Sequence, residues 1–368
     1  MRKVRVGIIG AGGVAQSRHL PRLASINEVD LAYIWSRDSI KATKVAKNFE
    51  IPKVANSWQE ITESTSIDAI IIATPPNLHL PVTLSALSSG KHVLCQARMA
   101  RNLSEARKML SASQKSDLVT ALYPPLPGLK GDLMVKRLIH QENYLGEIRE
   151  VRINGLARIP SNDKYSWQSD PDVTGLNTMT MGMWIEVLNR WVGKTESLIA
   201  KSTLHNKNRQ DPEGQSLASN IPDSITISAK LLCNAMGSYH FSNQAMLAPP
   251  QKIEIYGTAG TIDYTLFGDV LKIGKNNDEE LSEIQIPDNE IRLQTTDSEF
   301  IRAITHGTNV EPSFQEGIEY MEFTEAVAIS SFTEKNVTLP PEPMMLSLIH
   351  ISEPTRPRLI SYAVFCLK

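Results

Sequence analysis

Cysteine is scarce in this chain, and its placement supports neither a metal site nor a disulfide framework. Cys95, Cys233 and Cys366 stand far apart and match no short metal-binding spacing. We expect Cys95 and Cys233 to be small buried apolar residues. The sequence therefore predicts no metal centre, and its chemistry has to come from other side chains.

An excess of either charge is also missing. The chain has 38 Lys and Arg against 40 Asp and Glu, which leaves a formal net charge of -2. This balance gives no electrostatic basis for binding nucleic acid or an anionic membrane, and we expect neither as a partner. Apolar runs long enough to span a bilayer are absent as well. No leader precedes the first predicted strand, so we expect a cytoplasmic protein.

What the sequence does have is a glycine-rich turn after a good strand. The apolar run from Val4 to Ile9 predicts a buried strand, and small residues follow at Gly10, Gly12 and Ala15. This spacing fits G-x-G-x-x-G/A, in which the glycines let backbone approach a pyrophosphate at a helix N-terminus. The predicted cofactor contacts of this loop are Gly10, Gly12, Gly13 and Val14.

The end of the next strand bears on which dinucleotide binds. The predicted strand over residues 28–35 ends at Ser36-Arg37-Asp38, about twenty residues past the glycines, where a ribose contact is expected. A hydroxyl at Ser36 and a guanidinium at Arg37 suit the 2′-phosphate of NADP. The alternatives are a solvated turn or an acid supplied by Asp38, which would suit NAD. We favour NADP and leave NAD possible.

A third strand, predicted over residues 67–73, ends in a proline-rich turn. Ligands bind beyond the carboxyl ends of parallel strands, so we expect cofactor contacts from Thr74, Pro75, Asn77 and His79. A lone histidine such as His79 is more often structural than catalytic.

The order of predicted elements divides the chain. Up to residue 122, strands alternate with helices, which predicts a doubly wound parallel sheet of the Rossmann type. From residue 123 the alternation stops, and strands follow one another at 224–232, 235–241, 251–256, 261–264 and 270–273. We therefore predict an α/β protein with a Rossmann domain over 1–122 and an α+β domain with a mainly antiparallel open sheet over 123–345. Helices over 297–305 and 314–332 are expected to pack back onto the first domain, and 205–219 is expected to be an exposed loop.

Several stretches together resemble the Gfo/Idh/MocA family of nicotinamide-dependent oxidoreductases. They are GIIGAGGVAQSRHLP, IIIATPPNLHLP, KHVLCQARMA, GLNTMTMGMWIEVLNRWVG and IEIYGTAGTIDY. The resemblance implies a nicotinamide cofactor and a sugar- or polyol-like small-molecule substrate. It also implies an open sheet whose outer face often makes a dimer, so we expect a homo-oligomer.

The chain departs from that family at the positions that carry its chemistry. The family usually reads Glu-Lys-Pro where this chain has Gln96-Ala97-Arg98, and the lysine assists proton transfer beside the nicotinamide. A second motif, Asp-x-Gly-x-His, aligns its acid with Thr180 and its histidine with Trp184. Oxidation of a hydroxyl needs a base to accept the proton, and Ala97, Thr180 and Trp184 are not bases at neutral pH.

The resemblance places Gln96 at the cofactor and the following residues around a substrate pocket: Ala97, Arg98, Asn177, Thr180 and Trp184. Arg98 is able to bind an anionic group of the substrate, or to contact the surface or a cofactor phosphate instead. Trp184 is expected in the core, with a pocket wall as the alternative.

Glu186 is the nearest carboxylate and a weak candidate base, although it is equally placed to pair with Arg190, its i+4 neighbour. The leading hypothesis is an NADP-binding oxidoreductase with an atypical active site. The alternative is a catalytically inactive NADP-binding sensor or scaffold protein. The last residues, 346–368, resemble a translated sequencing adapter and are expected to lie outside the native fold.

Overall fold

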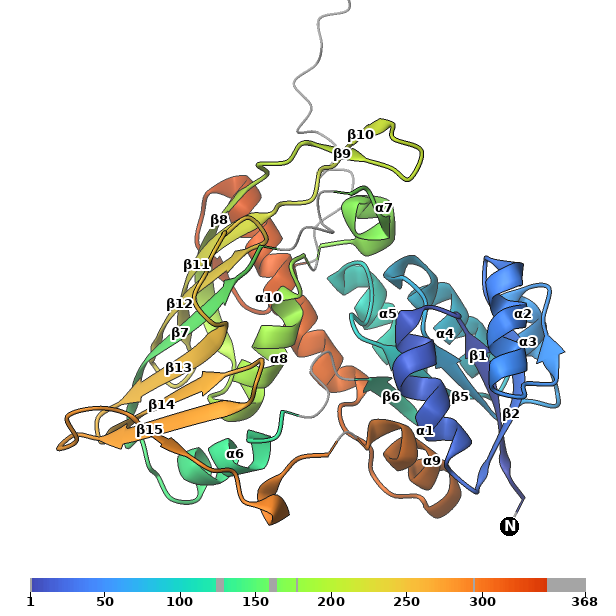
Figure 1. Cartoon of the computed structure of the whole chain (residues 1–368), viewed down its shortest axis with the longest axis horizontal. Coiled ribbons are helices and arrows are strands. Elements are labelled where there is room, and N and C mark those ends of the chain that lie inside the picture. Colours follow the sequence, from blue (N-terminus) through green and yellow to red (C-terminus); the bar gives the residue numbers. More distant parts are fainter. Residues whose placement is uncertain (1, 124–128, 159–163, 177, 294, 343–368) are drawn as a thin grey trace, which may run out of the picture.

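The computed structural model describes residues 2–123, 129–158, 164–176, 178–293 and 295–342 (Figure 1). The expected tail over 346–368 and the predicted pocket residue Asn177 lie outside these ranges. Within the described ranges, no helix combines the length and the apolar character needed to cross a bilayer.

The first half of the chain forms a parallel sheet, which confirms the Rossmann prediction. Its strands within the described residues are β1 (Val4–Ile9), β2 (Val29–Trp35), β3 (Lys53–Val54), β4 (Ala69–Ile72), β5 (His92–Gln96) and β6 (Thr120–Tyr123). They pair side by side in the order β3-β2-β1-β4-β5-β6, and every pairing is parallel. Strand order reverses between β1 and β4, which is where ligands bind in such sheets.

Helices pack on both faces of this sheet. They are η1 (Ala15–His19), α1 (Leu20–Ala24), α2 (Ser39–Asn48), α3 (Trp58–Glu63), η2 (Pro76–Leu78), α4 (His79–Ser88) and α5 (Leu103–Ser113). The side chains of Asp38, Ser57 and Asn102 cap α2, α3 and α5 by accepting a hydrogen bond from a backbone N–H of the first turn. Helix η1 is a π-helical segment that ends at His19, two residues before Pro21, and the ordinary helical hydrogen-bond pattern is interrupted there.

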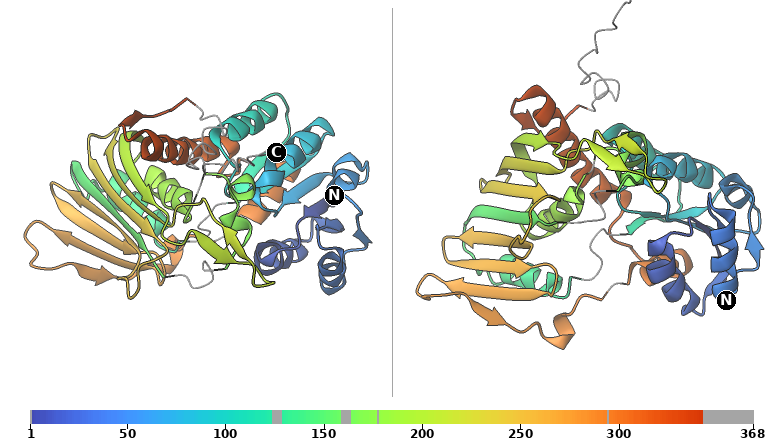
Figure 2. Two further views of the ribbon diagram at one scale, coloured as in Figure 1. Left: turned by 90° about the horizontal axis from the view of Figure 1, so that it is seen from above. Right: turned by 45° about the horizontal axis from the view of Figure 1, so that its top comes forward.

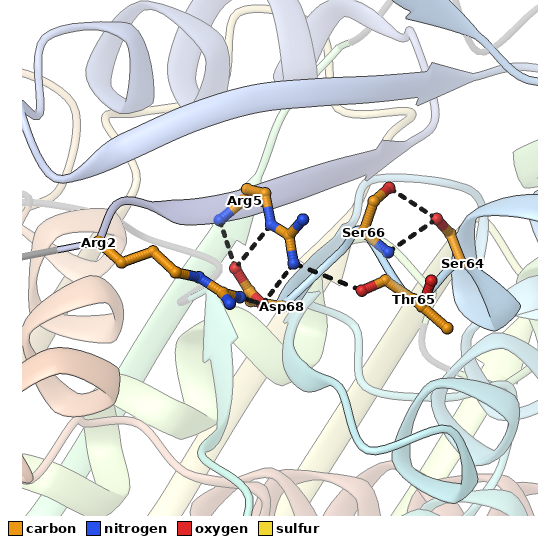
Figure 3. A network of polar contacts seen from close by, with 6 residues as sticks. All are labelled: Arg2, Arg5, Ser64, Thr65, Ser66 and Asp68. Atoms are coloured by element: carbon orange, nitrogen blue, oxygen red, sulfur yellow. Dashed lines mark hydrogen bonds and ion pairs between the residues drawn. The ribbon is translucent and has the colours of Figure 1, made fainter.

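A polar cluster lies at the amino-terminal edge of the same sheet, opposite the edge formed by the carboxyl ends of the strands (Figure 3). The backbone N–H of Arg5 in β1 donates to the Asp68 carboxylate at 2.9 Å, and its Nε lies 3.3 Å from the same oxygen. Arg2 forms an ion pair with Asp68 as well. Burial opposes ionisation of Asp68, but the hydrogen bonds and charge of Arg5 outweigh it and lower the pKa of this carboxyl group.

The second half forms an open sheet that is mainly antiparallel, again as predicted. Its order within the described residues is β16-β15-β14-β13-β7-β12-β11-β8-β17, and only the β7–β12 pairing is parallel. The strands are β7 (Ile148–Leu156), β8 (Thr195–Thr203), β11 (Ser224–Leu231), β12 (Met236–Ser242), β13 (Lys252–Gly257), β14 (Gly260–Thr265), β15 (Val270–Lys275), β16 (Ser282–Ile284) and β17 (Val337–Thr338).

Helices cover the face of this sheet that is turned toward the first half (Figure 2). They are α6 (Asp132–His140), α8 (Met181–Trp191) and α10 (Phe314–Thr333). The short helix α7 (Pro171–Thr174) packs instead against the turn η4 (Trp167–Ser169) and against η2, and the turn η5 (Asp288–Glu290) precedes α9 (Thr296–His306). Helix α9 returns to the first half and packs against α1, β5 and β6, while α10 packs against both β8 and α5. Both final helices thus contact the first half, as the sequence predicts.

Two predictions about the second half need correction. The stretch 205–219 is not only an exposed loop: β9 (Asn208–Gln210) and β10 (Ser216–Ala218) pair there as an antiparallel hairpin, because Arg209 and Ser219 are buried against Ser169. Cys233 is exposed, whereas Cys95 is buried as expected, because Cys233 lies in the turn between β11 and β12.

Candidate functional site

The first turn after β1 is shaped for a close approach of backbone. Gly10 has φ of +113°, and its N–H donates to the carbonyl of Trp35 at 2.7 Å. A Cβ at this position would lie 2.3 Å from the carbonyl oxygen of Ala73, so no other residue fits. By contrast, a Cβ on Gly12 or Gly13 would meet nothing within 4 Å. This loop surface is open, and the residues fit a bound dinucleotide pyrophosphate.

The end of β2 carries an exposed arginine, Arg37, and an aspartate, Asp38, that caps a helix. Arg37 is exposed and forms no hydrogen bond or ion pair with other residues of the described ranges, and Ser36 beside it is half-buried. The Asp38 carboxylate accepts a hydrogen bond from the N–H of Lys41 at 2.9 Å, as the N-cap of α2. Asp38 therefore already has a structural role at the position where a ribose-binding acid is expected.

The turn after β4 is tied to the end of β5 by His79. One ring nitrogen of His79 lies 2.8 Å from the Thr74 carbonyl, and the other lies 2.9 Å from the Arg98 carbonyl. The side chain is buried, and burial lowers the pKa of His79. His79 thus lies between the backbones of two loops of the site, and as a neutral imidazole it donates to one of these carbonyls at a time. Pro75 and Asn77 lie in the turn that it fixes, both half-buried.

At the end of β5, the Gln96 side chain joins a buried polar cluster. Its Oε1 lies 2.9 Å from Nε2 of His19, whose Nδ1 lies 2.6 Å from the carboxylate of Asp297 in α9. The His19 ring packs edge-on against Tyr123 at 4.3 Å between ring centroids, and Arg22 donates to the Tyr123 hydroxyl at 2.6 Å. This cluster fixes Gln96, which directly precedes Ala97, the residue at the position of the family's lysine.

The sequence does not reveal this cluster. His19 lies within the stretch GIIGAGGVAQSRHLP, but 278 residues separate it from Asp297, so no local pattern pairs the two. The only signal was that His19 lies in the helix after the glycine loop, which places it at the functional edge of the sheet.

Ala97 and Arg98 follow Gln96 at the junction of the two halves. The N–H of Ala97 donates to the carbonyl of Tyr123 at 3.1 Å, and its side chain is half-buried. The Arg98 guanidinium donates to the Thr174 hydroxyl at 2.5 Å and lies 5.8 Å from the centre of the Trp167 ring. Burial lowers the pKa of Arg98 to about 10, so the side chain stays charged at neutral pH.

Helix α8 carries the second motif, and its residues face different surroundings. Thr180, at the N-cap, is exposed with φ of +57°, and its hydroxyl donates to the Met179 carbonyl. Trp184 is 1% exposed and packs on Phe241 at 6.1 Å between ring centroids, in agreement with a place in the core. Its alternative role as a pocket wall stays a prediction.

Glu186 lies in a buried ionic network. Its Oε1 lies 2.8 Å from Nε of Arg190, and Arg190 also pairs with Asp132 of α6 at 2.7 Å. Asp132 accepts a further hydrogen bond from the indole N–H of Trp191 at 2.8 Å. Burial raises the pKa of Glu186, while the charge of Arg190 opposes that shift. The pairing alternative is confirmed, and the role of general base gains no support from these contacts.

The fold and the open glycine turn define a nicotinamide-dinucleotide-binding protein, and comparisons with known proteins agree. Residues 4–123 match the model described as an oxidoreductase family with an NAD-binding Rossmann fold. Residues 133–263 match the GFO/IDH/MocA C-terminal domain. The chain belongs to the Gfo/Idh/MocA family of oxidoreductases.

Curated relatives include a sugar reductase and other oxidoreductases. The chain is 31% identical over 166 residues to dTDP-3,4-didehydro-2,6-dideoxy-alpha-D-glucose 3-reductase of Saccharopolyspora spinosa, a match that covers 44% of this chain and 49% of that relative. It therefore spans about half of that relative's length. It is 22% identical to Oxidoreductase P35 of Formosa agariphila over 74% of this chain and 83% of that relative.

Solved structures share the whole fold. Levoglucosan dehydrogenase, in complex with NADH and L-sorbose, superposes with a TM-score of 0.80 at 20% identity, over 93% of this chain and 100% of that one. Aldose-aldose oxidoreductase from Caulobacter crescentus gives a TM-score of 0.76 at 17% identity, over 92% and 100% of the two chains.

Proposed function

We propose that this chain is an NADP(H)-dependent oxidoreductase that acts on a sugar- or polyol-like small molecule through an atypical active site. The observation that carries the proposal is the glycine turn, where Gly10 is pressed against Ala73 while Gly12 and Gly13 stay open. The names of the related enzymes support the substrate class. We also propose that the domains divide near residue 123, because β6 ends there and the next described helix, α6, packs with α8.

Distinct residues would hold the parts of the cofactor. The backbone of Gly10, Gly12, Gly13 and Val14 would cradle the pyrophosphate. Ser36 and Arg37 would bind the 2′-phosphate, since Asp38 already caps α2. The turn at Thr74, Pro75 and Asn77, fixed by His79, and the side chain of Gln96 would border the nicotinamide. When bound, the cofactor supplies hydride chemistry.

This chain differs from its family in the residues that would accept the proton of the substrate hydroxyl. Ala97 has no ionisable group, Thr180 is a neutral hydroxyl, and Trp184 is buried in the core. Glu186, the remaining candidate, pairs with Arg190. A general base typically contributes about 10²–10⁴-fold to rate. We therefore expect hydride exchange with ordinary neutral polyols to be very slow.

The alternative is a catalytically inactive NADP-binding sensor or scaffold. The residues at 97, 180 and 184 are the reason to test it, although the comparisons do not support it. Two measurements separate the readings: calorimetric binding of NADPH, and absorbance at the reduced-nicotinamide band with a panel of sugars, sugar acids and sugar phosphates. Hydride exchange with any member supports the enzyme. Tight NADPH binding with no exchange across the panel favours the sensor, and no cofactor binding refutes both. Assembly into a homo-oligomer stays a prediction for analytical ultracentrifugation.

A further inference from the structure

Arg98 is a half-buried cation without a carboxylate partner. No ion pair joins it to an acidic side chain in the described part of the chain, and the groups that contact its guanidinium are neutral: the hydroxyl and carbonyl of Thr174 and the ring of Trp167. Three other arginines that are half-buried pair with carboxylates, namely Arg101 with Glu105, Arg190 with Asp132 and Arg292 with Asp132. A desolvated charge without a counter-ion is costly, so the Arg98 site favours an anion.

The free edge of the guanidinium has the geometry for such an anion. Both hydrogen bonds of Arg98 use one terminal nitrogen, Nη1, and both end at Thr174. Nε and Nη2 form no hydrogen bond with the described residues. These two nitrogens form the side of the fork that binds a carboxylate or phosphate through two parallel hydrogen bonds.

The backbone around Arg98 is held on both sides. Its carbonyl faces Nδ1 of His79 at 2.9 Å, and the next N–H, of Met99, donates to the hydroxyl of Tyr320 at 2.6 Å. Its side chain reaches across to Thr174 and Trp167, in the segment that leads into α8. The guanidinium is therefore fixed between the two halves, one residue beyond the position that the family uses beside the nicotinamide.

We propose that Arg98 forms an oxyanion subsite, and that the substrate is a sugar-like molecule with a carboxylate or phosphate group near its reacting carbon. This inference rests on the proposed function, because it places the anion next to the nicotinamide position at Ala97. It also accounts for a charged side chain at 98, where the family has proline.

The test uses the full chain loaded with NADP and three probes: D-glucuronate, D-glucose 6-phosphate and D-glucose. Calorimetry first measures NADP affinity and then the affinity for each probe. The native chain is expected to bind at least one anionic sugar about tenfold or more tightly than glucose. The two anionic probes distinguish a carboxylate from a phosphate as the favoured group.

Substitutions assign the preference to Arg98. Arg98→Gln should bind the anionic probes no better than glucose and should leave NADP affinity within about twofold, while Arg98→Lys keeps the charge and should retain part of the preference. Thr174→Val leaves the Arg98 guanidinium in place and should retain most of the preference for the anionic probes. The matched control is Arg152→Gln, since Arg152 lies exposed on β7 and pairs with Glu150. Circular dichroism shows whether each variant is folded.

Three results would overturn the proposal: no anionic probe preferred by the native chain, a preference that survives in Arg98→Gln, or a loss of NADP affinity in that variant, which would make Arg98 a cofactor-phosphate contact. Failure of the native chain to bind either nicotinamide cofactor would instead refute the proposed function. Anion selectivity measured without cofactor then shows whether the Arg98 subsite stands on its own.

Discussion

The carboxylate of Asp297 and the imidazole of His19 meet at 2.6 Å, with both side chains fully buried. This contact joins α9, near the end of the chain, to the helix that follows the glycine turn. Through His19 it also reaches Gln96 at the end of β5. Helix α9 is therefore part of the support of the proposed nucleotide site.

Replacing Asp297 by Asn should weaken that support. The substitution removes a charged acceptor from a buried histidine, and we expect a loss of about 1–3 kcal/mol in the free energy of unfolding. Urea denaturation measures it. Asp288→Asn is the matched control, because Asp288 is exposed in η5 and should change stability by less than about 0.5 kcal/mol. Equal stability of the two variants would show that the contact contributes nothing.

Arg37 should set the preference for NADP. Charge-assisted hydrogen bonds to a 2′-phosphate contribute about 1.5–3 kcal/mol each, so calorimetry should show NADP binding more tightly than NAD. Arg37→Ala should remove most of that difference, while Arg149→Ala, an exposed arginine paired with Glu147, should leave it intact. If the native chain binds the two cofactors with equal affinity, Arg37 and Ser36 do not recognise the 2′-phosphate of NADP.

Glu186 should prove dispensable for chemistry. Its pKa is raised by burial, so the folded protein holds this proton more tightly than the unfolded chain, and stability falls as pH rises from the ordinary glutamate pKa toward the raised value. Glu186→Gln should therefore be neutral or slightly stabilising at neutral pH, with Arg190 still paired to Asp132. Hydride exchange with any substrate that the native chain turns over should change by no more than a few-fold. A folded variant that loses exchange by about 10²-fold would restore Glu186 as the base.

Asp68 should make stability depend on acid pH (Figure 3). Its pKa is lowered in the folded state, so its contribution is complete above the ordinary aspartate pKa and is lost as pH falls through the lowered value. Asp68→Asn should lower the melting temperature at about pH 7 and have little effect at about pH 2. A difference that is the same at both values would mean that the ion pairs with Arg2 and Arg5 do not stabilise the fold.

Local patterns were enough to predict much of the fold. The strand Val4–Ile9 has the predicted bounds, because a fully apolar run is a local signal. Strand β8, over Thr195–Thr203, was not predicted. It is buried only at scattered positions, and its place is set by pairing with β11 and β17. Tertiary contacts decide such a segment.

The features of the site also separate into those that follow from local sequence and those that require tertiary contacts. The glycine turn and the end of β2 were visible in sequence because their chemistry depends on neighbouring residues. The pairing of Glu186 with Arg190 was visible as i+4 spacing, but its extension to Asp132 was not, since helix packing brings Asp132 there. The open guanidinium edge of Arg98 likewise required the position of Thr174.

We propose that this chain combines an intact cofactor site with an active site that lacks the family's usual proton acceptors. The most direct measurement is the rate of NADP reduction, followed at the reduced-nicotinamide band, by the native chain and by Ala97→Lys across a panel of neutral sugars and inositols. We predict NADP binding with negligible reduction by the native chain. Lysine at 97 should not rescue it, because Trp184 still occupies the histidine's position. Rapid reduction of NADP with any neutral polyol by the native chain would contradict the claim.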